Sequence, residues 1–188
     1  MSALQGYLAQ VKGTPGVLPA VRVPLTASSW LNVTTKASAA NMKLYPSIAA
    51  QYRELVANLV ANYTGAGVVT ILDLHWSDDD TTNTPPMALK VRADGGPTGN
   101  AVDFWSSVAQ TFGANELVFY ELYNEPHIDD VDTYIHGSDQ YAGMLEMLAA
   151  VRAHAPHAVA IVAGAKQHVF CVSHGVFIMI EWRSCCWT

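Results

Sequence analysis

Short apolar runs alternate along this chain with longer segments in which apolar residues recur every three or four positions. The runs at residues 20–24, 68–74, 117–123 and 158–163 are rich in branched residues, as strands buried on both faces are. Three segments between or after them have the spacing of helices with one apolar face. This alternation predicts an α/β fold with a parallel sheet and right-handed crossovers.

Each predicted helix has a set of apolar residues that we expect to face the sheet. The first helix opens at Tyr45-Pro46 and ends before Gly65 and Gly67. The expected core-facing residues are Ile48, Tyr52, Leu55, Val56, Leu59 and Tyr63 in the first helix, Val102, Trp105, Val108 and Phe112 in the second, and Tyr141, Met144, Leu145, Leu148 and Val151 in the third.

Two long polar segments, at residues 75–100 and 124–137, come directly after predicted strands. Their content of Asp, Thr, Pro and Gly indicates loops, and loops of this length are usually functional. Their position places them at the carboxyl edge of the sheet, where α/β folds bind ligands. The alternation of side chains along a strand also predicts that Arg22, Asp73 and His75 share one face, which we expect to be the inward face.

The pattern breaks at about residue 167. Residues 168–175 have neither helical nor strand periodicity, and all three cysteines, Cys171, Cys185 and Cys186, lie after the break. The adjacent pair is a poor match to metal-ligand spacing, so incidental thiols are the simpler interpretation. We therefore expect a domain at residues 1–166 and a tail of doubtful origin at residues 167–188, the product of a mis-spliced or mistranslated gene model.

Composition narrows the class of protein. Apolar residues make up 51% and charged residues 14% of the 188 residues, which is typical of one globular domain. The net charge of −6 without a basic run disfavours a nucleic-acid or anionic-membrane surface. The N-terminus has no signal-peptide pattern, so we expect either an intracellular protein or a missing native start. Sequons at Asn32 and Asn62 support secretion only weakly.

Asn124 and Glu125 follow a buried strand and are the first candidates for chemistry. A glutamate presented there could act as a general acid. The neighbouring amide could hydrogen-bond a sugar 2-hydroxyl, a contact that strengthens in an oxocarbenium-like transition state. The alternative is a strand-ending asparagine beside an ordinary surface glutamate.

Three motifs in a fixed order along the chain favour the catalytic interpretation of Asn124 and Glu125. The segments VRVP at residues 21–24, ILDLHW at 71–76 and FYELYNEPH at 119–127 resemble glycoside hydrolase family 5, the large cellulase family. The resemblance covers roughly residues 15–166. It implies a partial (β/α)8 TIM barrel, roughly strands 2 to 5 with their helices. It also implies a secreted, retaining β-glycanase with two catalytic glutamates and no metal or organic cofactor.

The resemblance assigns roles residue by residue. Glu125 matches the acid/base and Asn124 the partner of the 2-hydroxyl. Arg22 matches the arginine that orders the surroundings of the nucleophile, and His75 the histidine near the sugar in the cleavage subsite. Trp76 could stack on a sugar ring or roof the barrel.

Arg22 also has a purely structural alternative, in which it pairs inside the sheet with a carboxylate such as Asp73 or Glu121. The structural and the functional interpretations are compatible with each other. Glu121, with apolar neighbours in sequence, is expected to be a buried structural partner.

Retaining hydrolysis requires a second carboxylate about 5–5.5 Å from the first. We identify no nucleophile in this sequence. Glu181 is a poor substitute, since residues 163–176 are too few for the intervening helices and strand.

The expected family activity is therefore hydrolysis of O-glycosyl bonds in β-linked polysaccharide, endoglucanase-like and impaired in this chain. The partner is a β-linked polysaccharide or oligosaccharide, with β-1,4-glucan, mannan and xyloglucan all open. The alternative is an inactive truncated remnant or faulty gene model with at most carbohydrate binding.

Overall fold

A computed structural model describes residues 19–32, 48–76, 86–90, 100–164, 169–173 and 176–180. For residues 48, 49, 76, 169–173 and 176–180 the description concerns the backbone alone.

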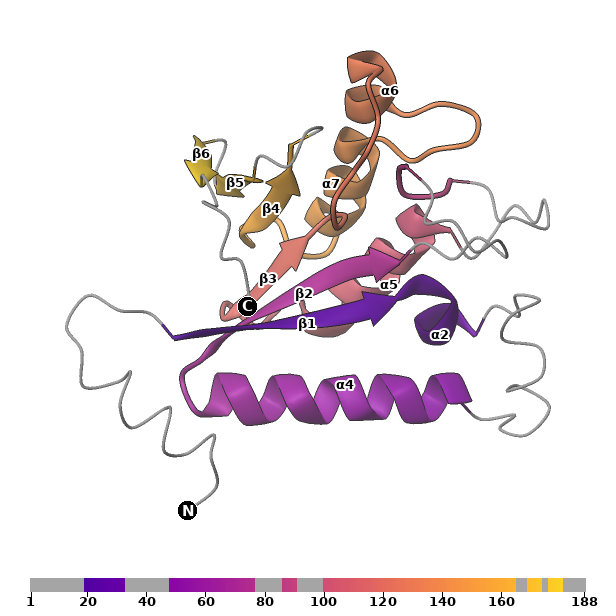
Figure 1. Ribbon diagram of the computed structural model, residues 1–188. Helices are drawn as coiled ribbons and strands as arrows, with labels where there is room; N and C mark the ends of the chain where they lie inside the picture. Colours follow the sequence, from indigo (N-terminus) through magenta and orange to yellow (C-terminus); the bar gives the residue numbers. More distant parts are fainter. Residues whose placement is uncertain are drawn as a thin grey trace, which may run out of the picture.

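The described residues form one six-stranded sheet with helices packed beside it (Figure 1). In chain order the elements are β1 (Ala20–Thr26), α2 (Ala27–Leu31), α4 (Ile48–Gly65), β2 (Val69–Trp76), α5 (Ala101–Phe112), β3 (Val118–Glu121), α6 (Val131–His136), α7 (Met144–Arg152), β4 (Ala160–Ala163), β5 (Val169–Ser173) and β6 (Val176–Ile180). Strands β1 to β4 are parallel and adjacent in sequence order, which confirms the α/β prediction and is the arrangement of part of a (β/α)8 barrel.

The strand register decides which side chains share a face. Asp73 on β2 lies opposite Pro24 on β1 and Glu121 on β3. Since residues in register on parallel strands point to the same side, and residues two apart do so too, this face also receives Arg22 and His75. The predicted common face is therefore observed, with Glu121 added to it.

The opposite face of the sheet packs on the helices. Leu72 and Leu74 of β2 and Tyr120 of β3 are fully buried there. Trp105 of α5 is also fully buried, and its ring contacts Tyr120 edge-on at a centroid distance of 5.9 Å. Figure 1 shows α4 running alongside β1 and β2, with α5 behind the sheet. The apolar runs thus have one face in a helical core and the other directed to the polar cluster.

The predicted helix faces are correct in their centres and wrong at their edges. On α4 the predicted Val56 is buried, Val60 is buried without having been predicted, and Leu55 is 57% exposed. On α7 the predicted Met144 and Val151 are buried, Met147 is buried without having been predicted, and Leu145 is 48% exposed. In both cases a residue one position outside the contacted stripe was counted as core, because the helix touches its neighbours over a narrower arc than the apolar spacing suggested.

Three short elements differ from the sequence predictions. Helices α2 and α6 are too short for a helical period to be detected, and α6 lies inside the predicted loop 124–137. Asp130 caps α6, since its side chain accepts from the backbone N–H of Asp132 at 3.1 Å. Strand β5 lies where no regular structure was expected. Both β5 and β6 pair antiparallel, unlike β1 to β4.

The boundary between a domain at 1–166 and a tail at 167–188 stays a prediction.

Within the described ranges, no helix combines the length and apolarity needed to cross a bilayer.

The indole of Trp105 gives a test of the helical core. Its Nε1–H donates to the carbonyl oxygen of Leu122 at 2.9 Å in a fully buried site. Trp105→Phe removes the donor and leaves that oxygen unsatisfied, so we expect the free energy of unfolding to fall by about 1–3 kcal/mol in urea denaturation. The control Leu145→Ala, at an exposed position, should change it by less than about 0.5 kcal/mol. Equal losses for the two variants would contradict the assigned core.

Candidate active site

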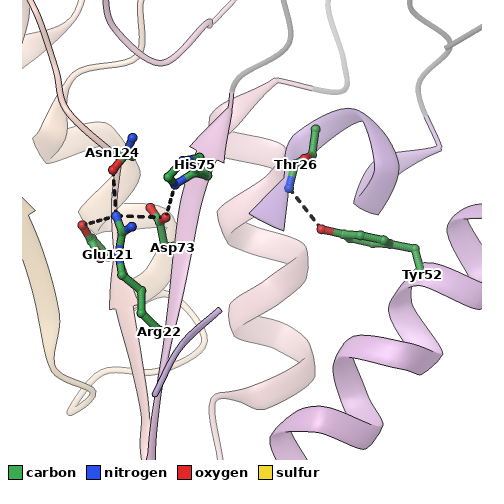
Figure 2. Close-up of polar contacts among 7 residues, drawn as sticks. All are labelled: Arg22, Thr26, Tyr52, Asp73, His75, Glu121 and Asn124. Atoms are coloured by element: carbon green, nitrogen blue, oxygen red, sulfur yellow. Dashed lines mark hydrogen bonds and ion pairs between the residues drawn. The ribbon is translucent and has the colours of Figure 1, made fainter. Parts of the chain in front are cut away.

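A charged cluster spans β1, β2 and β3 on one face of the sheet (Figure 2). The guanidinium of Arg22 forms a fork with Glu121, with Nε to Oε2 at 2.6 Å and Nη2 to Oε1 at 2.8 Å. Nη2 of Arg22 also lies 2.9 Å from Oδ2 of Asp73. One cation on β1 is therefore shared by carboxylates from the two following strands.

Asp73 is the most buried member of the cluster, with a side chain that is 0% exposed. Its Oδ2 also lies 2.7 Å from Nδ1 of His75, while its Oδ1 has no hydrogen-bond partner among the described residues. Burial, and after it the negative charge of Glu121, raises the pKa of Asp73 to about 6 against the opposing effects of Arg22 and His75.

Arg22 experiences opposing effects as well. Burial lowers its pKa, while the hydrogen bond to Glu121 and the charges of Asp73, Glu121 and Glu125 raise it. The attractions outweigh burial, and the pKa of Arg22 lies above its ordinary value. The cation is thus held in place by the carboxylates of Asp73 and Glu121, and the charge of Glu125 adds to the rise of its pKa.

Asn124 and Glu125 lie in the segment that follows the end of β3 at Glu121. The backbone N–H of Asn124 donates to the carbonyl of Leu74 at 3.0 Å, and its side-chain Oδ1 accepts from Nη2 of Arg22 at 2.8 Å. Glu125 is exposed, and its φ of 44° lies in the left-handed region that non-glycine residues rarely adopt. Backbone of this kind persists where surrounding contacts impose it, and it is concentrated at functional sites.

Backbone hydrogen bonds connect the segment 86–90 to the chain that follows Glu125. The backbone N–H of His127 donates to the carbonyl of Pro86 at 2.8 Å, and that of Ala142 donates to Ala88 at 2.8 Å. Lys90 adds an ion pair with Glu146 of α7 at 2.6 Å. These contacts connect the residues that follow Glu125 to α7 through the segment 86–90. They restrain the backbone next to the turn with positive φ.

The structure brings most of the sequence candidates together. Arg22, His75 and Asn124 join one network, and Glu125 acts on it through its charge. The pairing of Arg22 with carboxylates, weighed as one alternative, is observed with both Asp73 and Glu121. The roles of these residues toward a sugar stay predictions.

Other candidates fall outside what can be described. The side chain of Trp76 and the whole of Glu181 and Cys185 lie outside the described residues. Within the described ranges, no group of three His, Cys, Asp or Glu side chains is arranged to hold a metal ion.

The sequence reasoning missed the bond between Asp73 and His75. The signal was present, because residues two apart on a strand point to the same side and an aspartate there can reach an imidazole. Only the contact itself shows which ring nitrogen is engaged.

Comparison with known proteins identifies the family of this arrangement. The family model described as Cellulase (glycosyl hydrolase family 5) matches residues 18–186. No curated protein matches the chain in sequence.

Solved structures share the fold at low sequence identity. The chain is similar to a structure described as a lucidum protein, with 17% identity, a TM-score of 0.54, and coverage of 84% of this chain and 42% of that one. It is similar to the catalytic domain of the major endoglucanase from Xanthomonas campestris pv. campestris, with 20% identity, a TM-score of 0.53, and coverage of 85% and 45%.

A third similar structure is a complex of an endocellulase from Pyrococcus horikoshii with cellotetraose, with 21% identity, a TM-score of 0.51, and coverage of 85% and 44%. The chain thus spans less than half the length of these proteins.

The raised pKa of Asp73 predicts a pH dependence of stability. The folded chain binds this proton more tightly than the unfolded chain, because the pKa is about 6 against an ordinary 3.8. The contribution of Asp73 to stability is therefore complete below about pH 4 and is lost as the pH rises through 6, by an amount on the order of 3 kcal/mol. Urea denaturation from pH 4 to 7.5 should show Asp73→Asn gaining stability relative to wild type over this range.

The control is Asp132→Asn, whose side chain is 86% exposed and should show no comparable trend. A difference between wild type and Asp73→Asn that is flat with pH would show that Asp73 titrates normally.

The left-handed backbone at Glu125 gives a second prediction. Glycine adopts this conformation without strain, so Glu125→Gly should raise the free energy of unfolding by about 1 kcal/mol. Glu116 is also exposed and is not among the described residues with positive φ, so Glu116→Gly should lower it. Urea midpoints measure both changes, and a loss of stability in both variants would exclude strain at Glu125.

Proposed function

The chain belongs to glycosyl hydrolase family 5, and on that premise we propose that it carries the acid/base half of a retaining β-glycanase site. The family activity proposed for it is hydrolysis of O-glycosyl bonds in β-linked polysaccharide, of endoglucanase type. One observation carries the proposal: Asn124, next to Glu125, is bonded to Arg22 in the cluster that also holds His75.

Glu125 is proposed as the acid/base. It is exposed and lies in the chain beyond the carboxyl end of β3, the end of a barrel strand at which barrel enzymes bind substrate. In this role it protonates the leaving oxygen and later removes a proton from the attacking water. Asn124 is proposed to bind the 2-hydroxyl of the same sugar.

The remaining candidates have supporting roles. Arg22 is proposed to fix the side chains of Glu121 and Asn124 through its hydrogen bonds to them. His75 is proposed to contact the sugar at the cleavage subsite, and Trp76 to stack on a ring. Since one of the similar structures is an endocellulase with bound cellotetraose, a cello-oligosaccharide is the proposed ligand and an extracellular location is proposed with it.

Turnover by this chain is proposed to be impaired. A retaining enzyme needs a nucleophilic carboxylate about 5–5.5 Å from the acid/base, and none is assigned among the residues that the structure describes. Asp73 and Glu121 are both engaged by Arg22, and Asp73 is fully buried, so neither is a candidate. Without a nucleophile the covalent intermediate does not form.

Calorimetric titration with cellotetraose and a reducing-sugar assay on soluble cellulose and on mannan test the proposal. We expect the chain to bind cellotetraose and Asn124→Ala to weaken binding roughly tenfold, the effect of one lost hydrogen bond. We expect low turnover, which Glu125→Gln should reduce a further 10²- to 10⁴-fold, the usual contribution of a general acid.

Glu116→Gln is the matched control, because it makes the same change at an exposed glutamate before the opposite end of β3. Turnover that survives Glu125→Gln would exclude Glu125 as the acid/base. Binding with no turnover at all would favour the alternative of a remnant that only binds carbohydrate, and loss of both in wild type would refute the site.

A further inference from the structure

The two sequons of the chain differ in how much of each the structure describes. Asn32 is exposed at the end of α2, but residues 33 and 34 lie outside the described ranges. The second sequon, at residues 62–64, lies entirely in the last turns of α4. Each of its side chains can therefore be placed relative to the core and to solvent.

The side chain of Asn62 is on the solvent side of α4. Asn62 is exposed, and so is Asn58 one turn earlier. Val56 and Val60, which hold the helix on the core, are buried. Gly65 lies on the same face as Asn62, and a Cβ atom built there would meet nothing within 4 Å beyond its chain neighbours and its own helix. A bulky group on the amide nitrogen of Asn62 can therefore be accommodated without displacing the core.

The hydroxyl of Thr64, in contrast, is engaged with the protein. Its Oγ1 donates to the carbonyl of Val60 at 2.8 Å and accepts from Nδ2 of Asn115 at 3.0 Å. Residues two apart on a helix point to different sides, so the amide of Asn62 and this hydroxyl are not presented together. An enzyme that recognises a sequon must engage both groups, and the folded helix offers only one of them.

We propose that Asn62 is an N-glycosylation site that is modified before α4 folds. The proposal rests on the extracellular location proposed above, because this modification belongs to secreted chains. The amide nitrogen of Asn62 forms a bond to the anomeric carbon of an oligosaccharide carried on a lipid diphosphate. The bond from that carbon to the diphosphate oxygen breaks, the lipid diphosphate leaves with the electron pair, and the amide loses one proton to a base.

The place of Asn62 in the fold separates this glycan from the candidate active site. Helix α4 ends at Gly65 and leads into the amino end of β2 (Figure 1). Glu125 lies in the chain beyond the carboxyl end of β3, which is parallel to β2. Since the amino and carboxyl ends of parallel strands lie at opposite edges of a sheet, a glycan on Asn62 should not impede sugar binding near Glu125.

Secretion of the full chain from a eukaryotic host, behind a cleavable leader, tests the site. Release of the glycan with peptide N-glycosidase F in ¹⁸O-labelled water converts a modified asparagine to labelled aspartate, which peptide mass spectrometry locates. We expect the label at Asn62 in wild type and its loss in Asn62→Gln. Chain retained inside the host is digested too, so a variant that misfolds is still read.

Asn58→Gln is the matched control, since it makes the same change one turn away and outside any sequon, and it should retain the label. Thr64→Ser keeps a hydroxyl and should also retain it, whereas Thr64→Ala should lose it. An unmodified Asn62 in wild type would overturn the proposal. A label that persists in Thr64→Ala would overturn it as well.

A second assay tests the order of modification and folding. Purified oligosaccharyltransferase with a lipid-linked oligosaccharide is offered the folded, unglycosylated chain and, separately, a synthetic peptide of residues 56–68. We expect the folded chain to react more slowly by roughly tenfold or more, because freeing Thr64 breaks two hydrogen bonds. Equal rates would refute modification before folding.

Calorimetric titration with cellotetraose separates this proposal from the proposed function. If Asn62 carries a glycan and the chain binds no cellotetraose with or without it, the modification site stands and the sugar site fails. If the chain binds cellotetraose and Asn62 is never modified, the sugar site stands and the modification site fails. Weaker binding before glycan release than after it would contradict the separation of the two sites.

Discussion

Arg22 is shared by two carboxylates on neighbouring strands. The arrangement of the polar side chains around it depends on this interaction. The fork to Glu121 and the contact to Asp73 join β1 to β2 and β3 through side chains as well as backbone. Burying Asp73 without a nearby cation would cost several kcal/mol, so Arg22 must lie where the register puts it. His75 is oriented by its contact with Asp73, and Asn124 is oriented by its hydrogen bond from Arg22.

The sheet serves two purposes on its two faces. Leu72, Leu74 and Tyr120 anchor one face in the helical core, which holds the strands rigidly. The other face holds the charged cluster, where Arg22 remains 39% exposed. Rigid strands with polar groups at their carboxyl ends are the general basis of catalysis in barrel enzymes. The turn with positive φ at Glu125 adds an exposed glutamate beside this cluster in sequence.

Family membership and the geometry of the cluster support each other but concern different things. The match to glycosyl hydrolase family 5 establishes descent, and the similar structures establish the fold. The chemistry proposed for Glu125 and Asn124 rests on where their side chains lie. The chain spans less than half the length of the similar proteins, and catalysis by it is a proposal.

The sequence by itself determined the parallel α/β sheet, the helical core around Trp105, and the common face of Arg22, Asp73 and His75. These follow from periodicity, which is a local property of the chain. Only the tertiary structure decided that Glu121 and Asn124 meet the same guanidinium and that Asp73 engages Nδ1 of His75. The contacts of Arg22 to Glu121 and Asn124, at 2.6 and 2.8 Å, join residues 99 and 102 positions apart through the strand register, which no local pattern contains. The contact between Asp73 and His75 is local, but the ring nitrogen that it engages depends on a side-chain orientation that the sequence does not specify.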